Sequence, residues 1–491
     1  MINFLKKSIA KIWAKNHVAK TEDFKNNAEV LQEKLLLDLV KKSEKTLFGL
    51  QHNFSEIKSV EDFQKNVKIS DYEDLKPFVE KVKHGDKNIL WPEKPEYFAK
   101  TSGTTSGTKY IPLTKEGMDY QVKAAQSALF HYIAQKNNAD FVNGKMIFLQ
   151  GSPELEDIND IKTGRLSGIV AHHIPKYLQK NRLPSYETNC IEDWETKVDK
   201  IVEETEKENM TLISGIPPWL IMYFEKLIER NGKKIKQLFP NLQLIVTGGV
   251  NYEPYREKME ELLGGKVDII QTFPASEGFF AFQDDYEKEG LLLQSNHGIF
   301  YEFIPLELYG KPDAPRLTLK EVELNKDYAL ILTTNSGLWA YSIGDVVRFI
   351  SKNPHRILVS GRTKHFTSAF GEHVIAFEVE EAMKATVEKF PAQITEFHLA
   401  PQVNPENGEL PYHEWFIEFE KEPENLEDFR QNLDAEMRKR NTYYDDLISG
   451  NILQVLKITK LQKNAFQEYA KSEGKLGGQN KIPRLANDRK I

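Results

Sequence analysis

The sequence is poor in cysteine. Its 491 residues include one, Cys190. A single thiol excludes an internal disulfide framework and is typical of a protein from a reducing compartment, so we expect a cytoplasmic location. The neighbouring residues, Asn189 and Ile191, show no signature of a catalytic nucleophile, and we interpret Cys190 as a buried or incidental thiol.

Long apolar runs and an excess of positive charge are also missing. No run is long enough to cross a bilayer. Residues 1–20 mix apolar residues with lysines, and their apolar stretches are too short for a signal peptide. They predict an amphipathic helix that packs on the protein body, with a membrane-surface helix as the alternative. The formal net charge of −7 argues against nucleic acid as a partner. We therefore expect neither a membrane nor a nucleic-acid partner, and the oligomeric state stays open.

The length predicts two or three domains, because 491 residues exceed the usual size of one core. Strands alternating with helices between residues 145 and 271 predict an α/β sheet. Short strands over 291–351 predict a small antiparallel β subdomain. A polar, glycine-containing stretch at 360–364 reads as a hinge. We predict a large N-terminal domain, residues 1–360, and a smaller mobile α+β C-terminal domain, residues 361–491.

Hydrophobic periodicity and turn residues place the individual elements. Residues 1–85 are predicted to be mainly helical. Further helices are predicted over 114–135, 193–208, 220–229, 254–263, 378–390, 426–440 and 465–471. Strands are predicted over 97–99, 110–113, 145–149, 211–214, 242–247, 267–271, 298–303, 329–334, 346–350, 397–400, 414–419 and 453–458.

Residues 101–109 form the most distinctive stretch, with two glycines, six hydroxyl side chains and one lysine. Glycine lets the backbone approach a ligand closely, and consecutive N–H groups bind anions, so the stretch predicts a phosphate loop. A P-loop needs four residues between its glycines, whereas three separate Gly103 from Gly107. A plain surface loop remains the alternative. The predicted contacts are Ser102, Gly103, Thr104, Thr105, Ser106, Gly107 and Lys109.

Three further turns follow predicted strands: residues 215–217, 247–249 and 272–278. In open α/β sheets, ligands bind beyond the carboxyl ends of the strands, so Thr247, Gly248 and Gly249 are candidate ligand contacts. In the third turn, Ser276-Glu277 presents a carboxylate that suits Mg²⁺ bridging phosphates. A helix start is the alternative reading of Ser276-Glu277.

Two more residues are candidates from the C-terminal third. Asp345, within Tyr341–Asp345, suits the two ribose hydroxyls of a nucleotide. Lys481, in a basic glycine-rich tail, would supply mobile positive charge. A simple turn at Asp345 and a solvated lysine at 481 are the alternatives.

Taken in order, these motifs resemble those of a known family, the auxin-responsive (Gretchen Hagen) acyl acid–amido synthetases, in its bacterial form. That family belongs to the adenylate-forming superfamily with acyl-CoA synthetases and firefly luciferase. The resemblance covers nearly the whole chain. It rests on Thr101–Lys109, Phe273–Gly278, Tyr341–Arg348, Gly361–Arg362 and Gln479–Arg484. The sequence departs from the plant pattern at Phe273-Pro274, where plant members have Tyr-Ala or Tyr-Gly.

The resemblance implies an ATP-dependent, carbon–nitrogen bond-forming ligase. A carboxylic acid is adenylated with release of pyrophosphate, and an amine, expected to be an amino acid, takes the acyl group and releases AMP. Glu277 with Mg²⁺ and Lys481 are the implied catalytic residues. The implied nucleotide contacts are Thr247, Gly248, Gly249, Phe273, Ser276, Tyr341, Asp345 and Arg362, in addition to the loop.

Other functions stay open at this point. One is a thioester-forming acyl-CoA or acyl-carrier ligase on the same fold. Another is a nucleotide-binding protein without catalysis. The acid, the amine and the role of Lys109 are not set by the sequence. Candidate residues for the acyl pocket are Phe130, His172, His173 and Trp219, and the two histidines show no metal-ligand spacing.

Overall fold

The computed structural model describes residues 2–103, 107–174, 179–191, 193–249, 252, 255–363, 366–367, 374–403, 405, 409–449, 453–473, 482–486 and 489. It divides into two compact units. The first contains Met1–Val250, Leu263–Ile343 and Val347–Val359, and the second contains Asn251–Leu262, Gly344–Val346 and Ser360–Ile491. A domain boundary at 360–361 stays a prediction.

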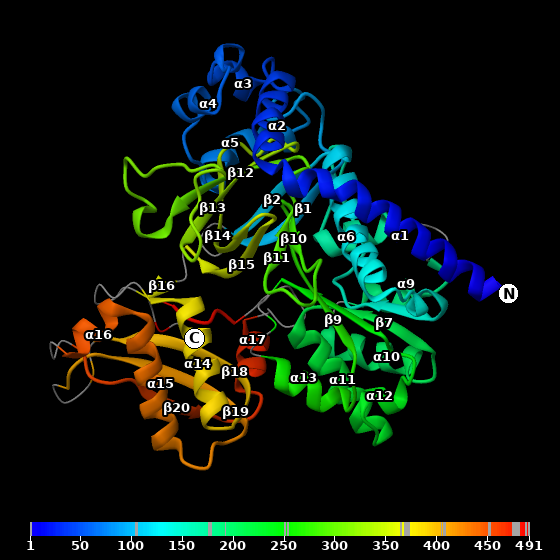
Figure 1. Ribbon diagram of the computed structural model, residues 1–491, viewed down its shortest axis with the longest axis vertical. Helices are drawn as coiled ribbons and strands as arrows, with labels where there is room; N and C mark the ends of the chain where they lie inside the picture. Colours follow the sequence, from blue (N-terminus) through cyan, green and yellow to red (C-terminus); the bar gives the residue numbers. More distant parts are fainter. Residues whose placement is uncertain are drawn as a thin grey trace. The chain divides into compact units, whose positions relative to one another are not determined.

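The first unit begins with helices, as predicted for residues 1–85. Polar side chains start several of them: Thr46, Ser59 and Asp71 each accept a hydrogen bond from a backbone N–H of the first turn. Figure 1 shows the first helix lying along α6, with Ala14 and Phe24 buried. The helices are α1 (Ile2–Asn26), α2 (Ala28–Lys42), α3 (Leu47–Gln51), α4 (Val60–Asn66) and α5 (Tyr72–Lys83).

A long mixed sheet forms the centre of this unit. Within the described part of the chain it has eleven strands, in the order β12-β13-β14-β15-β11-β10-β9-β8-β7-β3-β6. Neighbours from β9 to β6 are parallel, whereas the pairs β9–β10, β10–β11, β11–β15 and β12–β13 are antiparallel. The strands are β3 (Lys145–Phe148), β6 (Arg182–Leu183), β7 (Met210–Ser214), β8 (Leu244–Gly248), β9 (Asp268–Ala275), β10 (Gly278–Phe282), β11 (Leu291–Leu293), β12 (Ile299–Pro305), β13 (Asp327–Thr334), β14 (Tyr341–Lys352) and β15 (His355–Arg362).

This sheet confirms the α/β character and the antiparallel strands after residue 291. The sequence did not indicate that the parallel and antiparallel strands share one sheet. It also placed a turn over 272–278, and this was wrong in part: β9 continues to Ala275, where Phe273 pairs with Ala281 of β10. The turn between the two strands is therefore Ser276-Glu277 alone.

A smaller sheet carries the hydroxyl-glycine stretch. Its described strands are ordered β2-β1-β5-β4. The first two form an antiparallel hairpin that pairs Thr101 with Lys109. Residues 104–106, between these two strands in the sequence, lie outside the described residues. The strands are β1 (Tyr97–Gly103), β2 (Gly107–Leu113), β4 (Glu156–Ile158) and β5 (Ile161–Gly164).

Further helices pack around the central sheet. One of them starts earlier than predicted, at Pro217, because proline is well suited to the first turn of a helix. The helices are α6 (Lys115–Lys136), α7 (Leu166–His172), α9 (Tyr186–Cys190), α10 (Trp194–Thr205), α11 (Pro217–Asn231) and α12 (Ile235–Leu238). No helix in the described ranges combines the length and the apolar character needed to cross a membrane.

The second unit has its own core around Trp415, Leu433 and Tyr444. Its sheet, as far as described, has the order β18-β19-β20, and a two-stranded hairpin, β16–β17, precedes it. Predicted and observed bounds of α15 agree, whereas the predicted strand over 453–458 was wrong, because β20 begins at Lys457. The elements are α13 (Arg256–Leu263), β16 (Phe366–Thr367), β17 (Val374–Ile375), α14 (Ala376–Lys389), β18 (Gln393–Gln402), β19 (Tyr412–Lys421), α15 (Leu426–Arg440), α16 (Thr442–Ser449), β20 (Lys457–Leu461) and α17 (Ala465–Ser472).

Candidate active site

The candidate site begins at the carboxyl ends of two neighbouring parallel strands, β8 and β9. The turn predicted over 247–249 was wrong in part, because Thr247 and Gly248 pair with Gln271 and Thr272 as the last residues of β8. Gly249 follows at the edge toward which Ser276-Glu277 extends. Thr272 Oγ1 donates a hydrogen bond to the Thr247 carbonyl oxygen at 3.0 Å. A Cβ atom on Gly248 would lie 2.4 Å from Thr272 Oγ1, which explains the glycine.

Thr247 itself carries a buried side-chain hydroxyl. Its side chain is 2% exposed, and Oγ1 has no hydrogen-bond partner among the described residues. Buried polar atoms are normally paired, so an unpaired hydroxyl at the carboxyl end of a strand suits a ligand contact.

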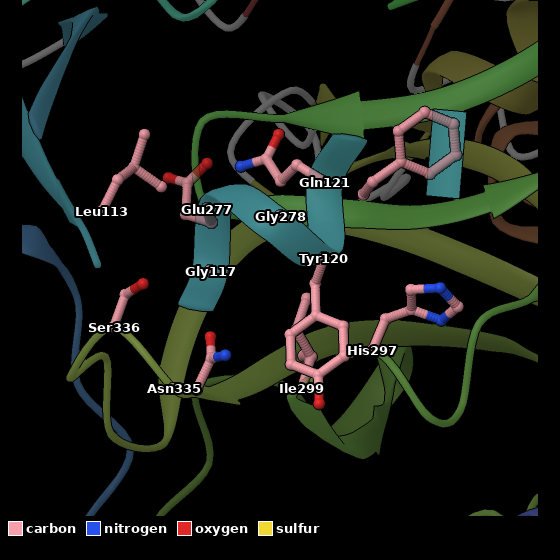
Figure 2. A pocket seen from close by; sticks show the side chains of 11 residues that line it. Leu113, Gly117, Tyr120, Gln121, Glu277, Gly278, His297, Ile299, Asn335 and Ser336 are labelled. Carbon is pink, nitrogen blue, oxygen red and sulfur yellow. The ribbon is translucent and has the colours of Figure 1, made fainter. Parts of the chain in front are cut away.

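Glu277 lines a narrow pocket of the first unit, shown in Figure 2. The pocket has a cavity volume of about 10 Å³, which holds roughly one water molecule. Its walls come from the end of β2, the first turns of α6, the β9–β10 turn, the start of β12 and the turn after β13. The lining residues are Leu113, Gly117, Tyr120, Gln121, Glu277, Gly278, Phe279, His297, Ile299, Asn335 and Ser336.

The start of α6 is fixed by a network centred on Thr114. Thr114 Oγ1 accepts a hydrogen bond from the Gly117 N–H at 3.0 Å and donates one to the Asn335 carbonyl at 3.0 Å. The Thr114 N–H donates to Ser336 Oγ at 3.2 Å, and the Asn335 N–H donates to the Gly298 carbonyl at 2.9 Å. Three segments distant in sequence are thus joined around the pocket.

Three polar side chains of the pocket each keep an unpaired buried atom. Gln121 Nε2, Asn335 Nδ2 and His297 Nδ1 have no hydrogen-bond partner within the described ranges. Burial, followed by the charges of His17 and Lys123, lowers the pKa of His297 to about 4, so its ring is neutral at pH 7. This ring makes an edge contact with Tyr120, with centroids 5.7 Å apart.

The predicted phosphate loop is described only in part. Thr104, Thr105 and Ser106 lie outside the described residues, and so do the side chains of Ser102, Gly103 and Gly107. Lys109 is described on β2, where its Nζ lies 5.6 Å from the centre of the Tyr72 ring. The phosphate contacts of this loop therefore stay predictions.

The remaining predicted nucleotide contacts are distributed over several strands. Phe273 is 7% exposed and packs edge-on against Phe280 at 5.0 Å in the core, so little of its ring is available to a ligand. Tyr341 is 1% exposed on β14, and Asp345 lies partly buried on the same strand. Ser276 is buried in the β9–β10 turn. Of Arg362 the structure describes the backbone alone, at the end of β15.

Two arginines of the recognised motifs have structural partners. Arg348 makes a two-pronged ion pair with Asp327, with nitrogen–oxygen distances of 3.0 and 2.5 Å. In the second unit, Arg484 contacts Glu396, donates to Glu380 at 3.2 Å and donates to the Tyr255 hydroxyl at 2.8 Å. Arg348 therefore stabilises the β13 and β14 region, and Arg484 anchors the C-terminal motif.

Lys481 lies outside the described residues, but the segment that follows it is fixed. The Leu399 N–H donates to the Arg484 carbonyl at 2.9 Å, and Leu485 bridges to Leu399 of β18 as in a parallel strand. His398 Nδ1 and the Pro483 carbonyl are 2.7 Å apart. The chain is therefore held from Pro483, two residues after Lys481, to Ala486.

The four candidates for an acyl pocket are not among the residues of the pocket beside Glu277. His172 Nε2 lies 2.8 Å from the Pro153 carbonyl, and His173 Nε2 lies 3.0 Å from the Tyr97 hydroxyl. These contacts are structural. Trp219 is buried. Phe130 packs on the core that contains Ala128 and Tyr132 of α6, and its ring centre lies 5.1 Å from that of His17.

Sequence reasoning missed Gln121, Asn335 and His297. They carry no local signature, because each is a single polar residue within an ordinary helix or turn. Only the fold brings them to one pocket with Glu277.

Comparison with known proteins covers almost the whole chain. The GH3 family N-terminal domain matches residues 17–181 and 159–269, the central domain matches 292–362, and the C-terminal domain matches 377–490. The chain belongs to the GH3 family. The resemblance read from the motifs is thus confirmed.

Curated relatives of this GH3 chain are plant proteins. The probable indole-3-acetic acid-amido synthetase GH3.1 of Arabidopsis thaliana is 21% identical over 549 residues, covering 95% of this chain and 90% of the relative. The jasmonoyl–L-amino acid synthetase JAR4 of Nicotiana attenuata is 24% identical over 359 residues, covering 58% and 60%.

Solved structures confirm the adenylate-forming fold of the GH3 chain. The AtGH3.15 acyl acid amido synthetase, in complex with 2,4-DB, superimposes with a TM-score of 0.79 at 17% identity, over 97% of this chain and 94% of that one. A 2-hydroxyisobutyryl-CoA ligase superimposes with a TM-score of 0.61 at 12% identity, over 93% and 88%.

Proposed function

We propose that this GH3 chain is an ATP-dependent acyl acid–amido synthetase. It adenylates a carboxylic acid with release of pyrophosphate and transfers the acyl group to an amine, an amino acid in our proposal, with release of AMP. The observation that carries the proposal is the edge of the central sheet, where Thr247 and Gly248 end β8, and Ser276-Glu277 follows the neighbouring parallel strand β9. The relatives' activities, as their names give them, support it.

The roles follow from the charge that the reaction moves. Attack of a carboxylate on the α-phosphate of ATP forms a phosphorus–oxygen bond and expels pyrophosphate, so negative charge accumulates on phosphate oxygens. Such a step is accelerated by positioning and by fixed positive groups. We assign the predicted phosphate loop, residues 101–109, and Thr247–Gly249 to nucleotide binding, Asp345 to the ribose, and Lys481 to the phosphate charge.

A magnesium ion suits Glu277. Mg²⁺ keeps several waters and is usually held by one or two carboxylates together with phosphate oxygens. In the described part of the chain no three His, Cys, Asp or Glu side chains gather as metal ligands. A single carboxylate at the β9–β10 turn fits the Mg²⁺–phosphate arrangement, in which the ion neutralises phosphate charge.

The second half-reaction does not need Lys481 at the phosphate. We propose that the smaller domain, residues 361–491, turns about residues 362–364 between the two steps, which is a hinge movement of a known kind. The Arg484 anchor would then move Lys481 together with that domain.

The test is pyrophosphate release in the presence of ATP and Mg²⁺, screened over aryl, indole-type and aliphatic acids. Mass spectrometry of end products with amino acids, and separately with coenzyme A, identifies the acceptor. Amides support the proposal, whereas thioesters assign the chain to the acyl-CoA ligases. Nucleotide binding without pyrophosphate release across the panel would indicate a non-catalytic binding protein.

Lys481→Ala tests the proposed role of the Lys481 ammonium group in adenylation. We expect carboxylate-dependent pyrophosphate exchange to fall by about 10²-fold or more, because the variant lacks a cation that acts in the transition state. Transfer from a supplied acyl-adenylate to the amine should change much less. Full-rate exchange in the variant would remove Lys481 from the first step.

A further inference from the structure

Three residues that line the pocket beside Glu277 each have a buried polar atom without a hydrogen-bond partner among the described residues. Gln121 is 7% exposed and Asn335 is 3% exposed, and an amide nitrogen of each is buried without a partner among the described residues. His297 contributes an unpaired ring nitrogen to the same pocket. Unpaired buried donors cost stability, so groups of this kind are kept where a ligand satisfies them.

The surrounding backbone makes room for these side chains. Gly298 has a φ of +73°, and a Cβ atom there would lie 2.6 Å from Asn335 Nδ2 and 2.9 Å from Tyr120 Cδ2. On the other side, a Cβ atom on Gly117 would lie 2.6 Å from Ser336 Oγ. The Asn335 amide therefore occupies space that Gly298 leaves open, and Gly117 leaves room for Ser336. Its backbone is held by Thr114 and Gly298.

The donors define the chemistry of the group that fits between them. Gln121, Asn335, His297 and Glu277 all line this narrow pocket (Figure 2). Amide NH₂ groups need an acceptor, which an amine does not offer in its protonated form. The residues that line the pocket include no lysine or arginine to pair with a second carboxylate, and the His297 ring is neutral. The cavity volume of about 10 Å³ admits one small group and not a ring.

We propose that Gln121 and Asn335 select a short acyl acid that carries a neutral oxygen, a hydroxyl or keto group, beside its reacting carboxyl group. This inference rests on the proposed function, and it assigns the pocket beside Glu277 to the acid rather than to the amine. A site that donates hydrogen bonds to a substrate oxygen discriminates strongly against the analogue that lacks it, because its own donors are then left unpaired.

The test uses matched acids that differ only in this oxygen: propanoate with its 2-hydroxy and 2-oxo derivatives, and butanoate with its 3-hydroxy and 3-oxo derivatives. The readout is kcat/KM for ATP–pyrophosphate exchange without amine, which reports on the acid alone. We expect an oxygenated acid to exceed its parent by at least about 10-fold. Asn335→Leu and Gln121→Met should each reduce that ratio about 10-fold or more, mainly through KM.

The control is Ile299→Val, which changes an apolar wall of the same pocket. It should alter the oxygenated acid and its parent alike and leave their ratio unchanged. The two polar substitutions lie on different elements, so the test survives if one variant fails to fold, as checked by circular dichroism.

The outcomes separate this inference from the proposed function. Exchange that favours the unsubstituted acids, or variants that affect only the amine-dependent step, would overturn the inference and leave the amido synthetase intact. No exchange with any acid would count against the proposed function. In that case, calorimetric titration of the wild-type protein and Asn335→Leu with the acid pairs decides the inference, and equal affinities would overturn it.

Discussion

Two buried polar clusters of the first unit differ in how completely their atoms are paired. In the first, Glu302 is 0% exposed, and its carboxylate accepts hydrogen bonds from two guanidinium nitrogens of Arg316, at 2.9 and 2.6 Å. It also accepts one from the Gln64 amide nitrogen at 3.0 Å. In the second, the pocket beside Glu277, Gln121 and Asn335 each keep a buried nitrogen without a partner among the described residues.

This difference suggests different roles: the paired cluster stabilises the fold, and the unpaired cluster suits ligand binding. The paired cluster joins β12 to the N-terminal helical region, because Arg316 also donates to the Val67 carbonyl at 2.5 Å. The buried nitrogens of Gln121 and Asn335 bond to no other group within the part of the chain that the structure describes, although the backbone of Asn335 is well fixed. Buried polar groups without partners are rare in folded proteins, so the second cluster is the one to expect at a functional site.

The largest effect should come from removing one partner of the paired cluster. We expect Arg316→Met to lower the free energy of unfolding by about 3–5 kcal/mol, because it leaves the Glu302 charge buried without its ion-pair partner. Urea unfolding measures this change. The double variant Glu302→Gln with Arg316→Met should regain part of the loss. A single variant as stable as the wild-type protein would remove the distinction between the clusters.

Glu277→Gln should do the opposite, with a large effect on turnover and a small one on folding. Losing the carboxylate proposed to hold Mg²⁺ should slow acid-dependent pyrophosphate release by about 10²–10³-fold. The free energy of unfolding should change by less than about 1 kcal/mol. Parallel rate and urea measurements test both statements, with Glu302→Gln as the matched control. A destabilisation comparable to that of Arg316→Met would place Glu277 with the structural residues.

Acid should weaken the fold through the pocket histidine. Burial lowers the pKa of His297 in the folded protein to about 4, whereas the unfolded chain titrates near the usual 6.5. Between these values the unfolded chain binds the extra proton, so stability falls as the pH decreases from about 6.5 to about 4, by up to about 3 kcal/mol. His297→Gln should make the pH dependence of urea unfolding shallower over this range. An identical slope in the variant would contradict the assigned protonation state.

The smallest effect is expected for the free energy of unfolding of Asn335→Leu, which also tests substrate selection. Asn335→Leu replaces an unpaired buried amide by an apolar group of similar size, so the free energy of unfolding should stay the same or rise by about 1 kcal/mol. Thermal unfolding followed by circular dichroism checks this without any substrate. A loss above about 2 kcal/mol would show that the Asn335 side chain has a structural partner.

Much of the local structure could be predicted because its signals are local. The helix over residues 426–440 is one case: Asn425 accepts from the N–H groups of Glu427 and Asp428, and arginine and lysine fill the last turn. Prediction was wrong at the strand that ends at Ala275, because Pro274 was read as part of a turn. It was also wrong at residues 453–456, where buried leucines precede the strand that begins at Lys457.

The motifs determined more about function than about geometry. The sequence alone predicted the family, the adenylate-forming fold, and the candidate residues Glu277, Asp345 and Lys481. These features follow from residue types at short spacings, which one chain displays without folding. The pocket formed by Gln121, His297, Asn335 and Glu277 was decided only by the tertiary structure. Its residues lie up to 214 positions apart in the printed sequence, and only the pairing of strands and the packing of α6 bring their side chains to one place.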